Sequence, residues 1–336
     1  MKGCRIPFHF FAAAVHVPGV CVLSCKKGCF RYAKEVTAMI KSDQLCKYFD
    51  GFCALNHISA TIEDGCIYGM VGSNGAGKST FLRLLSGVYK PDGGSVLIDG
   101  MPVWENPAVK SRIAYVPDEL YFLGGATMYR MARMYRSVYP HFDWGRFREL
   151  TGTFKLNPEK PIVTFSKGMK RQAATILAIS TRPDYIFFDE TFDGLDPVMR
   201  NYVKRLICQD VVERNASAII TSHSLRELED TCDQLSLLHK GGLVLESDIQ
   251  KLKTTQFKIQ IAFREEYTKD LFAGLDILYF VKHGSVSNMI VKGDREETVS
   301  RLSALHPVIL DVLPLTLEEV FTYEMEALGY SFQSEG

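Results

Sequence analysis

Four short apolar runs along the chain predict buried strands. The runs are Cys66–Val71, Ile113–Val116, Tyr185–Phe188 and Ser217–Thr221. An apolar run of this length is typical of a parallel strand that is covered on both faces. We expect helix from Thr80 onward and mainly helix across residues 126–182, including one helix from Met169 to about Thr181. Strands that alternate with helices indicate an α/β fold, in which ligands bind where the strands end.

The last part of the chain, from about residue 252, has a different pattern. Residues 257–261 alternate apolar and polar positions with period two, as a half-buried strand does. We then expect a helix over 266–272, strands over 277–282 and 285–292, a helix over 296–305, a strand over 308–312 and a final helix over 317–328. The order βαββαβ before the last helix predicts a small ferredoxin-like α+β domain. We favour a packing or dimerisation module here and keep a regulatory sensor as the alternative.

Composition limits the class of protein. The 336 residues include 46% hydrophobic and 23% charged residues, which argues against a disordered, collagen-like or coiled-coil chain and suggests about two domains. The 39 basic and 39 acidic residues give a net charge of zero, so bulk charge is no argument for nucleic-acid binding. The charge is uneven, at +5 over residues 1–38, +1 over 39–240 and −6 over 241–336.

The first 38 residues look unlike the rest. Lys2 and Arg5 precede a mostly apolar stretch from Ile6 to Leu23, which resembles a secretory or lipoprotein-type signal. We favour a disordered leader or a misassigned start, with Met39 as a plausible natural start; membrane association and export are the alternatives. No other segment has about 18 consecutive apolar residues, so we do not expect a channel or permease. The five cysteines after residue 38 have no C-x-x-C spacing and are expected to be reduced thiols in a cytosolic protein.

Residues 72–79 match the phosphate-loop pattern G-x-x-x-x-G-K-[ST] in full. The match lies between a predicted strand and a predicted helix, where backbone N–H groups and the helix N-terminus can bind phosphate oxygens. Lys78 is expected to reach the β- and γ-phosphates, and Ser79 is expected to bind Mg²⁺. The predicted nucleotide-binding residues of this segment are Gly72, Asn74, Gly75, Gly77, Lys78, Ser79 and Thr80.

Two other predicted strands end in residues that suit phosphate chemistry. The strand 185–188 is followed at once by Asp189 and Glu190. Asp189 is expected to help hold Mg²⁺, and Glu190 to polarise the attacking water. His223 follows the strand 217–221, so it should lie at the same edge of the sheet and contact the γ-phosphate.

With these residues in order, the chain resembles an ATP-binding-cassette (ABC) nucleotide-binding subunit. Residues 165–169 resemble the family signature LSGGQ, residues 194–197 resemble the D-loop, and His223 matches the switch histidine. The resemblance covers residues 40 to about 245. It implies an α/β P-loop NTPase fold of ABC type, with a mixed sheet core and a helical subdomain at about 126–182. We therefore divide the chain into a leader (1–38), an ABC ATPase domain (39–250) and a small α+β C-terminal accessory domain (251–336).

The resemblance also implies a mechanism. Family members form head-to-tail dimers, here homodimers or heterodimers, in which each ATP lies between the phosphate loop of one subunit and the signature of the other. Ser166 and Gly168 would contact the γ-phosphate of the opposite subunit's ATP, and Asp196 would lie at the dimer seam. Phe49, which precedes Gly72 by 23 residues, is expected to stack on adenine, with Tyr48 as its rival. The implied cofactors are ATP and Mg²⁺.

Three positions depart from the common family pattern. Asp118 stands where the family usually has the glutamine that contacts Mg²⁺ and the transmembrane partner, so we include it with Ser79 and Asp189 as a metal ligand. Lys167 and Met169 replace the usual Gly and Gln of the signature, and Thr191-Phe192 replaces the usual Pro-Thr after Glu190. Because Lys78, Glu190 and His223 remain as catalytic residues, we expect hydrolysis, although the turnover rate and the Mg²⁺ shell are open.

The resulting hypothesis is an ATPase subunit that powers a membrane transporter. Residues 166–170 and 316–321 resemble those of bacterial exporters whose integral membrane permease is a separate chain. Such a subunit is cytoplasmic and peripheral on the inner face of the cell membrane, and we expect no nucleic-acid partner. The Met and aromatic stripe at 128–135 is expected to be core, with permease docking as the alternative. A soluble non-transport ABC ATPase and a nucleotide-sensing regulator remain competing functions.

Overall fold

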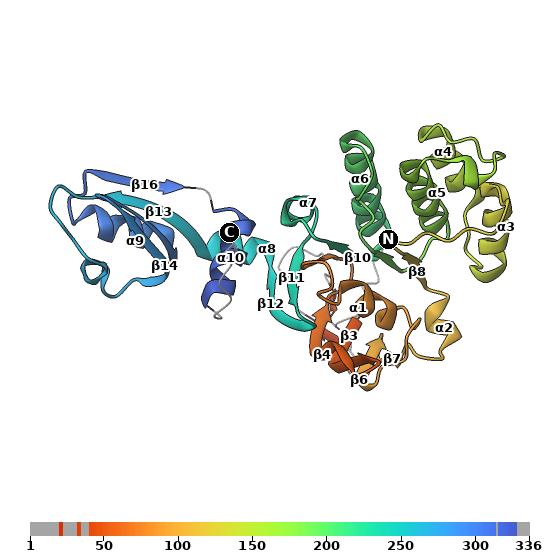
Figure 1. Ribbon diagram of the computed structural model, residues 1–336, viewed down its shortest axis with the longest axis horizontal. Coiled ribbons are helices and arrows are strands. Elements are labelled where there is room, and N and C mark those ends of the chain that lie inside the picture. Colours follow the sequence, from red (N-terminus) through yellow and green to blue (C-terminus); the bar gives the residue numbers. More distant parts are fainter. Residues whose placement is uncertain (1–19, 23–31, 35–39, 314, 328–336) are drawn as a thin grey trace, which may run out of the picture. The chain divides into compact units, whose positions relative to one another are not determined.

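The computed structural model describes residues 20–22, 32–34, 40–313 and 315–327 (Figure 1). The chain divides into two units, Met1–Thr37 and Ala38–Gly336. In the first unit, strand β1 (Val20–Val22) pairs antiparallel with β2 (Tyr32–Lys34). The rest of the predicted leader lies outside the described residues, as does Leu328, where we expected the last helix to end.

A six-stranded sheet forms the centre of the predicted ATPase domain. Its strand order is β12-β11-β5-β10-β9-β8, and only β12 runs antiparallel to its neighbour. Residues in β5, β9 and β10 are buried throughout, which explains the apolar sequences of β5 and β9 and the apolar centre of β10. The strands are β5 (Ile67–Val71), β8 (Ile113–Val116), β9 (Tyr185–Phe188), β10 (Ser217–Ser222), β11 (Gln234–His239) and β12 (Gly242–Asp248). All four strands predicted from the apolar runs are present.

A second, antiparallel sheet covers one face of the central sheet. Its order is β4-β3-β6-β7, with β3 (Ile40–Phe49), β4 (Phe52–Ile62), β6 (Gly93–Ile98) and β7 (Met101–Pro102). Helix α1 (Lys78–Leu85) contributes Phe81 and Leu85 to the same core as Ile40 and Tyr68, so it packs between the two sheets. This core fixes the start of α1, and therefore the phosphate loop, against β5.

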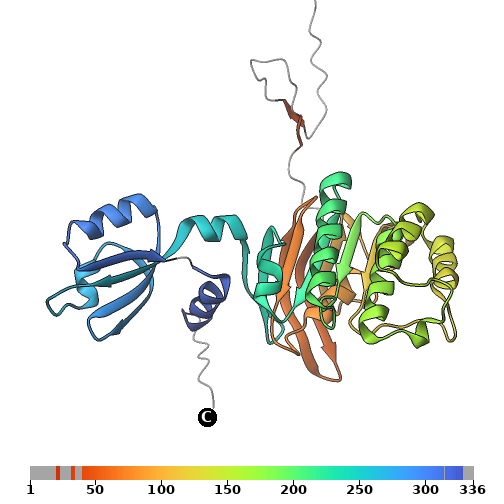
Figure 2. The same cartoon turned by 90° about the horizontal axis from the view of Figure 1, so that it is seen from above.

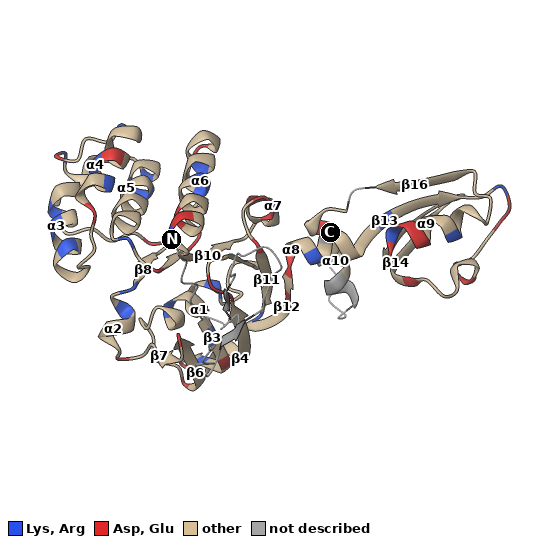
Figure 3. Ribbon diagram, turned by 180° about the vertical axis from the view of Figure 1, so that it is seen from behind, with Lys and Arg blue, Asp and Glu red and all other residues tan. Residues whose placement is uncertain are grey.

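On the other face, α5 (Lys167–Ser180), α6 (Pro197–Arg214) and the short α7 (Leu225–Glu229) contact the central sheet. Helices α3 (Met128–Val138) and α4 (Trp144–Thr153) pack against α5, and α2 (Pro107–Lys110) and a 3₁₀ turn (Ile162–Thr164) lie in the connections. In α3, Met128 and Met131 are buried in this core, whereas Met134 is exposed. The stripe is therefore core on one side and surface on the other. Figure 3 shows Lys and Arg along α3.

The accessory region forms its own antiparallel sheet, in the order β14-β15-β13-β16. This is the strand order of a ferredoxin-like domain. Its core joins Ile259 and Met289 to Leu302 of α9, which covers one face of the sheet (Figure 2). The elements are α8 (Ile249–Thr255), β13 (Gln256–Ala262), β14 (Asp276–His283), β15 (Val286–Lys292), α9 (Arg295–Ser303), β16 (Ile309–Leu313) and α10 (Leu317–Ala327).

The helix that we predicted over 266–272 is wrong. The structure has only a 3₁₀ turn there, Lys269–Phe272. The hydroxyl group of Tyr267 is held by Ser287 Oγ at 2.8 Å and by the carbonyl oxygen of Ile261 at 3.1 Å. These contacts fix Tyr267 against the sheet and leave too few residues for an α-helix before the buried Phe272.

Helix α10 follows the accessory sheet but packs on the ATPase domain. Leu317, Val320 and Phe321 lie in the same core as the helices on the central sheet. Arg226 of α7 pairs with Glu318 at 3.0 Å, and Lys258 of β13 pairs with Glu319 at 2.7 Å. One helix therefore contacts both the accessory sheet and the helix that follows His223. Among the described residues, no helix is long and apolar enough to cross a membrane.

Candidate active site

The phosphate loop joins β5 to α1 in a conformation that requires glycine. Gly75 and Gly77 have φ values of 80° and 108°, in the left-handed region. A Cβ atom on Gly72 would collide with the carbonyl oxygen of Leu238, and one on Gly77 would lie 2.6 Å from Leu55 Cδ2. The loop therefore lies close to its neighbours and keeps a fixed shape at the N-terminus of α1.

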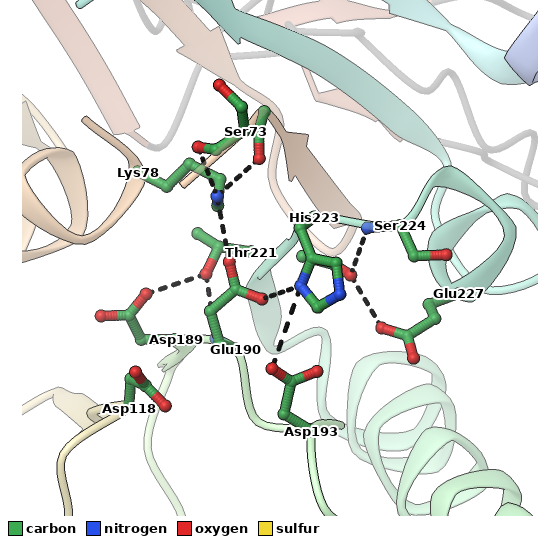
Figure 4. Close-up of polar contacts among 12 residues, drawn as sticks. Ser73, Lys78, Asp118, Asp189, Glu190, Asp193, Thr221, His223, Ser224 and Glu227 are labelled. Atoms are coloured by element: carbon green, nitrogen blue, oxygen red, sulfur yellow. Dashed lines mark hydrogen bonds and ion pairs between the residues drawn. The ribbon is translucent and has the colours of Figure 1, made fainter. Parts of the chain in front are cut away.

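Lys78 fastens this loop from inside. Its side chain is 5% exposed, and its Nζ atom donates to the carbonyl oxygens of Gly72 at 2.6 Å and Ser73 at 3.1 Å. The same atom forms an ion pair with Glu190 Oε1 at 3.0 Å (Figure 4). The ammonium group is thus held at the wall of the cavity, where it can meet phosphate oxygens.

Asp189 lies at the end of β9 and is fully buried. Its Oδ1 atom accepts hydrogen bonds from Ser79 Oγ and Thr221 Oγ1, both at 2.9 Å, and its Oδ2 atom accepts from the Tyr115 hydroxyl at 2.9 Å. Burial, and next the negative charge of Asp189, raise the pKa of Tyr115, so the phenol stays protonated as a donor. Three hydroxyl groups therefore compensate the buried carboxylate and orient Ser79.

Glu190 links the phosphate loop to His223. Its backbone adopts a left-handed conformation, with φ of 46°, which costs about 1–3 kcal/mol in a residue other than glycine. Its carboxylate contacts Lys78 on one side and His223 Nδ1, at 3.1 Å, on the other. The strained backbone directs the carboxylate into the cavity instead of along the strand.

Asp193 lies next to this chain of contacts. Its Oδ2 atom is 3.9 Å from His223 Nδ1, and ligand atoms of Glu190, Asp193 and His223 all lie within 4.8 Å of one another (Figure 4). Burial raises the pKa of Asp193; His223 acts in the opposite direction, and the charges of Glu190 and Glu227 add to the increase. The site thus concentrates carboxylates around one imidazole.

A cavity of about 330 Å³ lies over the phosphate loop. Its lining includes most of the predicted nucleotide-binding residues: Phe49, Asn74, Gly75, Gly77, Lys78, Ser79, Thr80, Asp118 and Glu190. Phe49 lines the cavity and is 38% exposed, and the more exposed Phe52 lines it as well. Tyr48, the alternative to Phe49 for stacking on adenine, is not among the lining residues. An aromatic rim beside a phosphate-binding loop suits a nucleotide.

The oxygen groups of this cavity fit Mg²⁺. Ser79 offers a hydroxyl group and Asp118 a carboxylate, and Mg²⁺ prefers a few such oxygen ligands together with water and phosphate. Asp189 has both oxygen atoms engaged by hydroxyl groups, which suits it to orienting Ser79. Asp118 is also engaged, because its Oδ1 atom accepts from Arg171 Nη2 at 2.6 Å.

Ser166, Gly168 and Asp196 are absent from the lining of the cavity. Ser166 Oγ accepts from the Met169 backbone N–H at the start of α5, and Asp196 Oδ1 accepts from two N–H groups at the start of α6. These are helix N-caps. A Cβ atom on Gly168 would lie 2.9 Å from the carbonyl oxygen of Gly194, so the signature and D-loop segments touch each other.

Sequence reasoning missed several residues of the site. Tyr115 and Thr221 lie on the strands that flank β9, and Thr221 Oγ1 also accepts from the Glu190 backbone N–H at 3.0 Å. A hydroxyl group near the end of an otherwise apolar strand was the available signal. Arg171 and Asp193 gave no such signal, because their partners Asp118 and His223 are distant in sequence.

A glycine loop between strand and helix, a buried lysine and carboxylates at the carboxyl edge of a parallel sheet define a P-loop nucleoside triphosphatase. Comparisons with known proteins agree. The family model for ABC transporter matches residues 55–193. The ABC transporter ATP-binding protein YtrB of Bacillus subtilis (strain 168) is 35% identical over 283 residues, which is 84% of this chain and 97% of YtrB.

Other relatives are less similar. The daunorubicin/doxorubicin resistance ATP-binding protein DrrA of Streptomyces peucetius is 29% identical over 232 residues, 66% of this chain and 68% of DrrA. Among solved structures, an ATP-binding subunit of an ABC transporter gives a TM-score of 0.59 at 22% identity, covering 64% of this chain and 92% of that one. A dimeric ATP-binding cassette with bound ADP and phosphate gives 0.58 at 20% identity, covering 63% and 99%.

This chain belongs to the ATP-binding subunits of ABC transporters. The family and fold expected from the motifs are confirmed, and the protein is an ATPase that binds ATP.

Proposed function

We propose that this chain hydrolyses Mg²⁺–ATP at the site around Lys78 and Glu190 to power an exporter whose permease is a separate membrane protein. The observation that carries the proposal is the contact chain Lys78–Glu190–His223, in which Lys78 and Glu190 line the cavity over the phosphate loop and His223 contacts Glu190 from outside its lining. Such an arrangement can bind a γ-phosphate, accept a proton and respond to the loss of the phosphate.

The proposed chemistry assigns one task to each group. Loop N–H groups and Lys78 bind the phosphates. Ser79, oriented by Asp189, would hold Mg²⁺, and the ion would supply charge neutralisation at the phosphates. Lys78 forms an ion pair with Glu190, and phosphate binding would draw Lys78 away and free the carboxylate. Glu190 then accepts a proton as water attacks the γ-phosphorus and the bond to ADP breaks. His223 orients Glu190 and contacts the γ-phosphate.

Two copies of the chain are needed in this proposal. Ser166, Gly168 and Asp196 lie outside the cavity that their own chain forms, so they are available to ATP and to the seam of a second subunit. The structural similarity to a dimeric cassette supports this arrangement at the level of the fold. Homodimers and heterodimers both satisfy it.

The membrane partner and the direction of transport rest on the relatives. DrrA is described as a resistance protein for daunorubicin and doxorubicin, and BcrA of Bacillus licheniformis as a bacitracin transport protein. Exposed apolar side chains near Asp118 and on α3, namely Tyr121, Met134 and Val138, supply a surface that a permease could cover. We therefore place the protein at the cytoplasmic face of the cell membrane.

Glu190→Gln tests the catalytic assignment. We expect turnover to fall by about 100- to 10,000-fold, the usual contribution of a general base, while ATP binding and ATP-dependent dimerisation persist. Phosphate release and size-exclusion chromatography measure the two properties. Glu213→Gln, at an exposed carboxylate of α6 that accepts from Gln209 outside the cavity, is the control and should retain turnover. Equal hydrolysis by wild type and Glu190→Gln would remove Glu190 from the mechanism.

Purification from membranes tests the transport assignment. The tagged Glu190→Gln variant, trapped with ATP, should copurify with an integral membrane protein of several spans. ATP-dependent dimers with negligible hydrolysis in the wild type would favour a nucleotide sensor. Salt-sensitive binding to nucleic acid, without a membrane partner, would favour a non-transport ABC ATPase.

A further inference from the structure

Arg171 is a buried cation that forms an ion pair with Asp118. It lies in α5 and is 1% exposed. Its Nη2 atom donates to Asp118 Oδ1 at 2.6 Å, whereas Nε and Nη1 are buried and have no hydrogen-bond partner among the described residues. A guanidinium group with most of its donors unused depends strongly on the one carboxylate that it does contact.

Besides its ion pair with Arg171, Asp118 lines the nucleotide cavity. Its side chain is 49% exposed and shares the cavity with Ser79 and Glu190. Asp189 is fully buried and engaged by three hydroxyl groups, and Glu190 is engaged by Lys78 and His223. Asp118 is therefore the accessible carboxylate of the cavity. Its Oδ1 atom is engaged in the ion pair with Arg171.

Arg171 also acts on a second carboxylate. Its positive charge favours the ionised form of Asp193, in opposition to burial, which raises the pKa of that group. This longer-range attraction is weaker than the 2.6 Å ion pair, so Asp118 remains the main partner of Arg171.

We propose that Arg171 is a positioning residue that withholds Asp118 from Mg²⁺ in the nucleotide-free protein, so that binding of Mg²⁺–nucleotide exchanges the Arg171–Asp118 ion pair for an Asp118–Mg²⁺ contact. Arg171 lies in α5, two residues after the signature segment, residues 165–169. The exchange releases α5 from the end of β8 and so links nucleotide binding to the segment offered to the opposite subunit. The inference rests on the proposed use of this cavity for Mg²⁺–nucleotide.

The test compares nucleotide affinity with Mg²⁺ and with EDTA, measured by calorimetry with a non-hydrolysable ATP analogue. In Arg171→Met, Asp118 is free from the start, so the enhancement of affinity by Mg²⁺ should rise about fivefold or more over wild type. In Asp118→Asn and in the double variant Asp118→Asn/Arg171→Met, the enhancement should be no larger than in wild type. Arg182→Met removes an ion pair with Asp210 outside the cavity and should match wild type.

Thermal unfolding without nucleotide gives an independent arm. Asp118→Asn leaves Arg171 without its partner and should lower Tm more than the double variant does, because the double variant removes the buried charge as well. This arm needs no nucleotide, so it reports on the ion pair alone.

Each outcome supports or contradicts either the proposed role of Arg171 or the proposed function of the cavity. An unchanged Mg²⁺ enhancement in folded Arg171→Met overturns the proposal. So does an enhancement that stays high in the double variant, because loss of a cation near the phosphates would then explain it without Asp118. A wild type that fails to bind the analogue contradicts the proposed function of the cavity instead, and a double variant no more stable than Asp118→Asn contradicts the role of the ion pair.

Discussion

The central sheet of the ATPase domain and the sheet of the accessory domain use polar side chains differently. At the carboxyl ends of β8, β9 and β10, the polar groups of Tyr115, Asp189 and Thr221 are bonded to one another beneath the cavity. In the accessory sheet, the core is apolar, and Tyr267 uses its hydroxyl group to anchor a loop. Buried polar groups cost stability unless each is satisfied, so their concentration at one sheet edge marks where chemistry is performed.

Lys78→Ala should have the largest effect of these variants. It should lower nucleotide binding and turnover in the ATPase domain and leave the accessory domain unchanged. Loss of a cation that contacts the transferred phosphate typically lowers turnover by about 100- to 1,000-fold. Nucleotide titration and phosphate release measure the result, with exposed Lys251→Ala as the control. Unchanged affinity for ATP would remove Lys78 from the phosphate site.

Ile259→Ala probes the accessory side. Ile259 is fully buried in the accessory core, and truncation of such a residue costs about 2–5 kcal/mol. We expect a lower unfolding midpoint in denaturant for this domain, while ATP affinity at the phosphate loop changes little. Exposed Leu278→Ala on β14 is the control. A loss of ATP affinity equal to that of Lys78→Ala would show that the two regions are not separable.

Thr221→Val probes the polar network beneath the cavity. The hydroxyl group donates to Asp189 and accepts from the Glu190 backbone. Its loss leaves the Glu190 backbone N–H without this partner and removes one of the three donors to Asp189, at about 1–3 kcal/mol. Chemical denaturation and ATP turnover should both decline. Thr221→Ser keeps the hydroxyl group and should restore both; if Ser behaves like Val, packing of the methyl group is the cause.

Glu319→Gln should have the smallest effect and concerns the link between the two regions. Burial alone would raise the pKa of Glu319, but hydrogen bonds from Lys258 and Thr316 outweigh it and lower the pKa. A lowered pKa means that the contact stabilises the protein above the unfolded-state pKa and is lost as pH falls through the folded-state pKa. Because the Glu319 side chain remains partly exposed to solvent, at 28%, screening weakens the ion pair and we expect about 0.5 kcal/mol or less.

Thermal melts across the acidic range measure this effect. The wild type should lose a small part of its stability as the solution becomes acidic, and Glu319→Gln should lack that part. Glu265→Gln, at an exposed carboxylate of the same domain, should melt like wild type. Identical acid profiles for wild type and Glu319→Gln would contradict the contribution.

The sequence was sufficient where one element determines the result. The strands that contain Val71, Phe188 and Thr221 were predicted from short, mainly apolar segments. Gly77 was predicted from the phosphate-loop pattern, and the structure leaves no room for a side chain at this position. The sequence was insufficient where distant segments meet. In the sequence, Arg171 looks like any polar residue of a helix, because its partner Asp118, which follows β8, is distant along the chain. The helix expected before Phe272 is absent because Tyr267 contacts residues on other strands.

Helix α10 has a consequence for the order of events during synthesis. Its residues Leu317, Val320 and Phe321 complete the apolar core that β5 begins with Ile67. A ribosome extends a chain by about 5–20 residues per second, so this core stays unfinished for several seconds after the last strand of the central sheet has emerged. The accessory domain is made during that interval. A nascent chain that stops before α10 would therefore leave apolar surface exposed beside the helices on the central sheet, where chaperones and proteases can recognise it.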